Sequence, residues 1–260
     1  DSCLKELKNS GGNVASSVED VGKICDVVFI MVMNGNQVKD VVAKLSAGLK
    51  DDGIIIITAT ITPEEVRSAY EIAKKNNIEM IDSPVSGGLQ GAHEGTLTLM
   101  SAADKNVFNN CKDILKSISK DIFHVGNNIG DGQTVKASLQ VFIGATFTAI
   151  FESLVLGSKA GIDGKTLYDV FSSSGVSSPL FKNCAKLIMD RKFENTGSHI
   201  STMYKDLGIS MGMAKEIGVP MFTAAAAFEL FQAGISSYPE GDNWSIVKVL
   251  EKMSNTKVEW

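Results

Sequence analysis

The chain has 260 residues, of which 44% are hydrophobic and 21% charged, and its formal net charge is −5. This is the composition of an ordinary globular protein that is long enough to bury a core. There is no basic block that would attract nucleic acid or an anionic membrane surface, so we expect neither as a partner. Apolar runs such as "CDVVFIMVM" are far shorter than the roughly 20 residues that span a bilayer.

Cysteine and histidine positions bear on disulfides and metals. The four cysteines are scattered without a CxxC pair, and the three histidines do not have the spacing of metal ligands. We therefore expect neither a disulfide framework nor a metal site. Reduced thiols favour a cytoplasmic location, with an organelle matrix as the alternative.

The first half of the chain alternates helix and strand patterns. The opening "DSCLKELKNSGG" predicts the second half of a helix that Gly11 and Gly12 close. Continuous β-branched runs at residues 26–32 and 53–59 predict strands covered on both faces, with a helix between them. Thr62 followed by Pro63 predicts the start of the next helix.

Two further strands are predicted in "IEMIDSPV" and "TLTLMSA", and after another helix a third in "DIFHVG". This alternation indicates a parallel sheet with right-handed crossovers. A long apolar helix follows, from about residue 133 to 159, and helical patterns continue almost to the end. We therefore predict an α/β domain over residues 1–131 and an all-α domain over residues 132–260, with the long helix at their junction.

Ligands of open parallel sheets bind beyond the carboxyl ends of the strands. The predicted strands end in "MNGNQ", "TATIT" and "SPVSGG", which are mostly backbone and small hydroxyls. Gly87 and Gly88 would let a carboxylate approach two successive amides, and Ser86 would add a hydroxyl donor. The alternative is an ordinary glycine turn.

Lys136 stands one turn into the long apolar helix. A lysine there can exchange protons with a substrate, or it can extend to solvent. Gln140 lies one turn later on the same face and can contact whatever Lys136 touches. Lys205, beside Asp206, fits a solvated charge pair. The loop "GNNIGDGQTVK" matches neither common nucleotide-binding glycine pattern.

Four segments in a fixed order, "TATITP", "DSPVSGG" with "GTLTLM", "GDGQTVK" and "YKDLG", resemble the β-hydroxyacid dehydrogenase family over essentially the whole chain. The resemblance implies a nicotinamide-dependent oxidoreductase that uses NAD or NADP and acts on a small hydroxy acid. By the same resemblance Lys136 is the general acid and base, assisted by Gln140. The other implied roles are substrate binding by Ser86, Gly87 and Gly88, and cofactor binding by Met33, Asn34, Thr60 and Lys205.

The chain departs from the family pattern after the lysine. Typical members carry two asparagines three and four residues further on, where Leu139 and Gln140 stand here. With a glutamine at this position, the chain most resembles the branch of the family that oxidises four-carbon sugar acids such as L-threonate. The alternatives are 3-hydroxyisobutyrate oxidation and reduction of glyoxylate, tartronate semialdehyde or succinic semialdehyde.

The family opens with a strand, a GxGxxG turn, a helix and a second strand, and this sequence shows none of them. The resemblance therefore implies an incomplete Rossmann-type parallel sheet and a fragment or a processed chain. Without the phosphate-binding turn, a non-catalytic scaffold derived from a dehydrogenase is the rival function. The long apolar helix and the helical domain also predict a homodimer or homotetramer.

Overall fold

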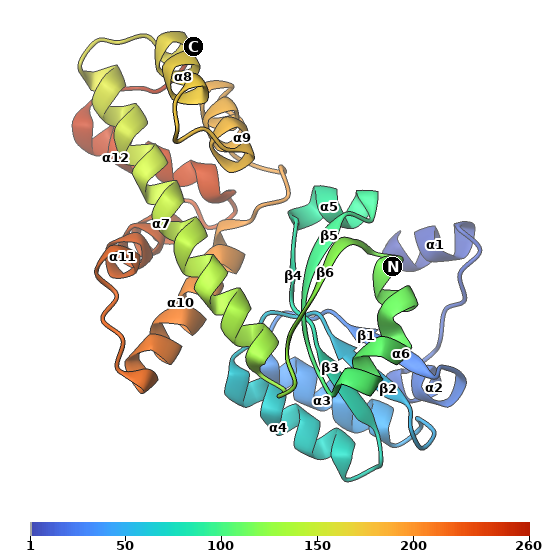
Figure 1. The fold of residues 1–260 in the computed structure, drawn as a ribbon. Helices are drawn as coiled ribbons and strands as arrows, with labels where there is room; N and C mark the ends of the chain where they lie inside the picture. Colours follow the sequence, from blue (N-terminus) through green and yellow to red (C-terminus); the bar gives the residue numbers. More distant parts are fainter. Residues whose placement is uncertain (1) are drawn as a thin grey trace. The chain divides into compact units, whose positions relative to one another are not determined.

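The computed structural model describes residues 2–260, which form two compact units (Figure 1). The first unit contains residues up to Gly87 together with residues 94–136, and the second contains residues 88–93 and 137–260. An α/β unit followed by helices, with one long helix, is the predicted fold class, and it is confirmed. The predicted domain boundary after residue 131 stays a prediction.

The first unit is built on a six-stranded sheet with the order β1-β2-β3-β5-β4, and β6 pairs with β5. The first three strands are parallel, as predicted. However, β5 runs antiparallel to both β3 and β4 and parallel to β6. The sheet is therefore mixed, because the chain returns from β3 through the short β4 instead of a full crossover. The strands are β1 (Val27–Ile30), β2 (Ile54–Ile57), β3 (Glu79–Asp82), β4 (Val85–Ser86), β5 (Leu97–Ala102) and β6 (Ser119–Gly126).

Both faces of the sheet are covered, which explains the unbroken apolar strands. Ile55 and Ile57 of β2 are buried in a cluster with residues of α3 and α4, whereas Ile56 between them is buried in a cluster with α6. Thr62 and Glu65 form a reciprocal capping box at the start of α4, where the sequence predicts a helix start. The helices of this unit are α1 (Ser2–Asn9), α2 (Val18–Ile24), α3 (Gly35–Ser46), α4 (Pro63–Lys74) and α6 (Lys105–Lys116).

The second unit is helical. Its core contains Phe151, Leu207 and Phe231, all fully buried. The helices are α5 (Gly88–Glu94), most of α7 (Asp131–Lys159), α8 (Gly164–Ser173), α9 (Pro179–Met189), α10 (Ile200–Ile217), α11 (Phe222–Ser237), a 3₁₀ turn (Asn243–Ile246) and α12 (Val247–Ser254). The sequence did not predict α5, nor α2 in the first unit.

Helix α7 runs through 29 residues, of which the first six belong to the first unit. By length and composition alone, this helix is long and apolar enough to cross a membrane. Its middle buries Phe147, Phe151 and Leu154 in the helical core. At Gly144 an added Cβ would lie 2.8 Å from the side chain of Leu207, so α10 packs closely on this part of α7.

Candidate functional site

The carboxyl ends of β1, β2 and β3 lie at one edge of the sheet because the three strands are parallel. Asn34, which follows β1, caps α3 by accepting a hydrogen bond from the backbone of Gln37 at 3.0 Å. Gln37 in turn accepts from the backbone N–H of Met33 at 2.9 Å. The side chains of Met31 and Met33 are 67% and 58% exposed and offer an apolar surface here.

Asp82, the last residue of β3, is fully buried. Its Oδ2 accepts hydrogen bonds from the backbone N–H groups of Gly130 at 2.9 Å and of Gln133 at 3.1 Å. These N–H groups stand at the start of α7, where a helix has no internal acceptors for them. A carboxylate from the sheet therefore caps the helix that carries Lys136.

Gln133 connects the same helix to the loop after β2. Its Nε2 donates to the Asp82 Oδ1 at 2.8 Å and to the carbonyl oxygen of Ala59 at 3.1 Å. Its Oε1 accepts from the backbone N–H of Ile61, also at 3.1 Å. The two backbone partners flank Thr60, so one buried amide holds the peptide groups on both sides of that residue. We refer to Asp82, Gln133, Ala59, Ile61 and Gly130 as the amide clamp.

Burial raises the pKa of Asp82 to about 6, although the hydrogen bonds from Gln133, Gly130 and Gly132 act in the opposite direction. The carboxyl group is therefore harder to ionise in the folded protein than in the unfolded chain.

The stability of the protein should therefore depend on pH through this group. Because the folded pKa is raised, the contribution of Asp82 is fully present below the unfolded pKa near 3.8 and is lost as the pH rises through about 6. The loss corresponds to about 3 kcal/mol. Urea unfolding at several pH values gives the free energy of unfolding of the wild type and of Asp82→Asn. The loss is the change with pH in the difference between these two free energies. A difference that is constant from pH 4 to pH 7 would contradict the buried, proton-binding carboxyl.

Lys136 is 7% exposed, in the turn that follows the capped start of α7. The predicted alternative, in which this lysine extends into solvent, is therefore wrong. Gln133 lies three residues before it, so both residues move with the first turns of the helix.

The segment with Ser86, Gly87 and Gly88 begins at the end of β4, the short strand after β3. Ser86 is half-buried in β4 and opposes Thr98 of β5. Gly87 and Gly88 have φ angles of 129° and 62°, which favour glycine. An added Cβ at Gly88 would meet nothing within 4 Å, so the backbone conformation and not crowding explains this glycine. Gly88 also begins α5, whereas the sequence predicted a loop there.

In the second unit Gln140 and Asp206 meet. The Gln140 Nε2 donates to the Asp206 Oδ2 at 2.6 Å, and both side chains are buried. The Lys205 Nζ lies 2.8 Å from the other carboxylate oxygen, with 30% of the lysine side chain exposed. Lys205 and Asp206 were predicted as a solvated pair, but the carboxylate is buried. The structure thus joins the predicted residues Gln140 and Lys205 through Asp206, which the sequence did not single out.

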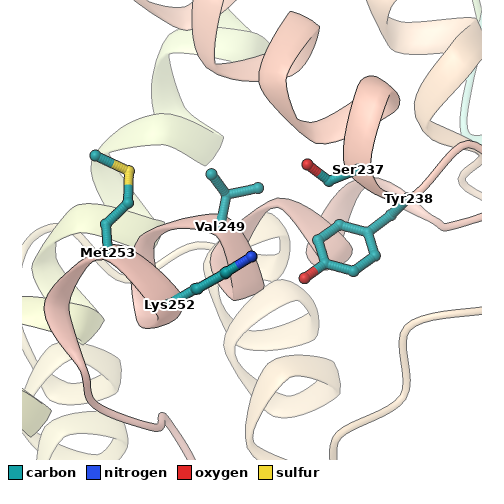
Figure 2. Close-up of a pocket in the computed structure, with 5 residues that line it drawn as sticks. All are labelled: Ser237, Tyr238, Val249, Lys252 and Met253. Carbon is teal, nitrogen blue, oxygen red and sulfur yellow. The ribbon is translucent and has the colours of Figure 1, made fainter.

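Two surface hollows lie in the helical unit, away from these residues. One of about 670 Å³ is lined by Ser237 and Tyr238 at the end of α11 and by Val249, Lys252 and Met253 of α12 (Figure 2). Another of about 440 Å³ is lined by residues 191–196 and by Lys248. Neither hollow contains a predicted site residue. Within residues 2–260 no three His, Cys, Asp or Glu side chains are grouped so that they could hold a metal ion.

The two parts of the chain match two family models. Residues 1–126 match the NAD binding domain of 6-phosphogluconate dehydrogenase, and residues 130–250 match the NAD-binding domain of NADP-dependent 3-hydroxyisobutyrate dehydrogenase. These matches cover the segments that contain the amide clamp, Lys136 and the Gln140–Asp206 pair.

Curated relatives match along nearly the whole chain. It is 30% identical to 2-(hydroxymethyl)glutarate dehydrogenase of Eubacterium barkeri, over 95% of this chain and 83% of that protein. It is 32% identical to a probable mitochondrial 3-hydroxyisobutyrate dehydrogenase of Dictyostelium discoideum, over 94% and 78%. An L-threonate dehydrogenase of Haemophilus influenzae is 28% identical, over 98% and 86%.

Among solved structures, 3-hydroxyisobutyrate dehydrogenase from Salmonella typhimurium superposes with a TM-score of 0.88 at 25% identity, over 95% of this chain and 88% of that one. The fold, the two cofactor-domain matches and the two relatives of 30% and 32% identity agree. The chain belongs to the β-hydroxyacid dehydrogenase family and is an NAD(P)-dependent dehydrogenase of that family.

Proposed function

We propose that the protein oxidises a small hydroxy acid, or reduces the corresponding carbonyl acid, with Lys136 as general acid and base. The observation that carries the proposal is the burial of this lysine, 7% exposed, directly after a helix start that Asp82 and Gln133 hold against the sheet. An amine that is held in place and shielded from bulk water can exchange its proton with a bound substrate instead of with the solvent.

The residues after β1 and β2 fit the nicotinamide end of the cofactor. Exposed methionine side chains at this edge offer an apolar surface that a flat ring can cover. We assign Met33, Asn34 and Thr60 to this role, and Lys205 to cofactor binding. When bound, the nicotinamide supplies the group that accepts or gives hydride.

The substrate carboxylate would bind at Ser86, Gly87 and Gly88. The two glycines have positive φ angles and no side chains, so a carboxylate can approach their backbone N–H groups closely. Ser86 adds a hydroxyl donor. During oxidation the Nζ of Lys136 takes the proton of the substrate hydroxyl, and during reduction it returns a proton to the carbonyl oxygen. Since Nε2 of Gln140 binds Asp206, its Oε1 is the atom that can accept from a substrate hydroxyl.

The leading substrate is a four-carbon sugar acid such as L-threonate. Gln140 supports it, because the amide reaches one methylene further than the asparagine of typical members and suits a longer polyol. Leu139 is neutral between this acid and its rivals. These are 3-hydroxyisobutyrate and the semialdehydes of the reductase branches, and relatives of both kinds match the chain.

The test is a kcat/KM panel with NAD and NADP. It should contain L-threonate, 3-hydroxyisobutyrate and 2-(hydroxymethyl)glutarate, each beside its methyl ester as a matched control without the charge. Hydrogen bonds to a charged group contribute about 1.5–3 kcal/mol, so we expect the ester of the best acid to react at least about tenfold more slowly. Equal rates for acid and ester would reject the carboxylate site. If the protein does not bind a nicotinamide cofactor saturably, the rival function of a non-catalytic scaffold derived from a dehydrogenase is favoured.

We also place the protein in the cytoplasm or an organelle matrix. The four cysteines are unpaired in the described residues, and the two buried ones, Cys111 and Cys184, have raised thiol pKa values because of burial. This state suits a reducing compartment. A homodimer or homotetramer stays a prediction.

A further inference from the structure

We propose that Gln133 is a positioning residue that couples the Thr60 loop to the helix turn carrying Lys136, and that Asp82 fixes the orientation of its amide. The inference rests on the proposed roles of Thr60 and Lys136. It assigns to Gln133 and Asp82 a function that the sequence motifs do not show.

The orientation of the amide is determined by its partners. Nε2 faces two acceptors, the Ala59 carbonyl oxygen and the Asp82 carboxylate, and Oε1 faces one donor, the Ile61 N–H. A flipped amide would place its oxygen against two acceptors and its NH₂ against a donor. All three contacts are therefore satisfied in one orientation only.

The bonds span Thr60 from both sides. The Gln133 side chain binds the carbonyl of the residue before it and the N–H of the residue after it, both within a buried segment. The backbone of Thr60 is thereby fixed relative to α7. Any shift of the helix start then moves the peptide groups next to the proposed cofactor residue.

The same side chain lies three residues before Lys136 on α7. Residues three apart on a helix are neighbours on its surface, so a rotation or a fraying of this turn displaces both. Asp82 opposes such movement, since it accepts from the backbone N–H of Gln133 as well as from its side chain. The clamp thus sets the distance between the cofactor loop and the lysine.

Other side chains cannot make this set of contacts. Asparagine is one methylene shorter, and methionine has the length but leaves the Ile61 N–H and the Ala59 carbonyl without partners. Glutamate keeps the acceptor for Ile61 but places a second carboxyl next to Asp82, where the pair must share a proton. The three substitutions therefore remove different numbers of the hydrogen bonds in the amide clamp.

The experiment compares Gln133→Met, Gln133→Glu and the control Ser119→Ala in the full-length protein. Ser119 is also buried in the first unit, and its hydroxyl donates to the Leu115 carbonyl, outside the clamp. The measurements are the dissociation constant of the nicotinamide cofactor, kcat, and hydrogen exchange of the Ile61 amide. Near-ultraviolet circular dichroism checks that each variant keeps its tertiary packing.

For Gln133→Met we expect cofactor affinity and kcat each to fall at least about tenfold and the Ile61 amide to exchange at least about tenfold faster. Gln133→Glu should give intermediate values, and Ser119→Ala should stay within about twofold of the wild type. If Gln133→Met matches Ser119→Ala in all three measurements, the positioning role is wrong. If it is misfolded, the decision passes to Gln133→Glu, and values within twofold of the wild type overturn the proposal.

A double variant separates this proposal from the role of Lys136. The effects of substitutions on kcat are not additive when the residues act as a unit. If Lys136 carries the proton, the double variant Lys136→Ala with Gln133→Met should therefore have a kcat less than about threefold below that of Lys136→Ala alone. The losses of cofactor affinity and Ile61 protection should persist in the double variant. If Lys136→Ala alone is active, the proposed function fails, but these two measurements still decide the clamp.

Discussion

Replacing Lys136 with alanine is expected to lower kcat by at least about a hundredfold and to leave cofactor affinity within a few-fold of the wild type. A positioned general acid or base contributes about 10²–10⁴ to the rate. The lysine is buried, so bulk water cannot readily take over the proton transfer. Initial rates with the best hydroxy acid, together with a cofactor titration of the same preparation, measure both quantities.

Two variants show whether the loss belongs to proton transfer. Lys136→Arg keeps the positive charge, but a guanidinium does not release its proton near neutral pH, so we expect nearly the full loss. Lys159→Ala changes an exposed lysine at the other end of the same helix and should stay within about twofold of the wild type. A small external amine should restore part of the activity of Lys136→Ala. If the arginine variant keeps wild-type activity, charge and not proton exchange is the function of this residue.

The parts of the fold that local chemistry determines could be predicted from the sequence. Thr62 and Pro63 begin α4 because a cap needs only neighbouring residues. The strands β1 and β2 could be predicted because burial on both faces leaves an unbroken apolar run. Helix α5 was missed because Gly88 and Gly91 are poor helix formers, so its sequence is typical of a loop. The direction of β5 depends on its pairing with β3 and β4, which local patterns do not encode.

The candidate site divides in the same way. A lysine in an apolar stretch of helix left burial and solvent exposure open as alternatives, and the catalytic role of Lys136 stays a prediction from the family resemblance. Its supporting contacts could not be predicted, since Asp82 and Gln133 are 51 residues apart and Gln140 and Asp206 are 66 apart. Single polar contacts over such separations have no sequence period. The one available signal was the acidic residue that ends β3, directly after the apolar Met80 and Ile81.

The second large expected effect is a loss of stability on substitution of Gly132, where α7 approaches the sheet closely. A Cβ at this position would lie 2.6 Å from the carbonyl oxygen of Met100 and 2.7 Å from that of Asp82. Both obstacles are backbone atoms, which cannot rotate away. Gly132→Ala should therefore lower the free energy of unfolding by about 2–3 kcal/mol, although alanine is the better helix former by about 1 kcal/mol. Urea unfolding measures the change.

Gly212→Ala is the matched control, because Gly212 also lies within a helix, α10, but an added Cβ there would meet nothing within 4 Å. It should gain up to about 1 kcal/mol of stability from helix propensity alone. The two substitutions are chemically identical, so opposite signs isolate the contact between the α7 start and the sheet. That contact brings Asp82 within reach of the helix N–H groups. If Gly132→Ala were as stable as Gly212→Ala, the helix start would not be seated against β3 and β5, and Asp82 could not position it.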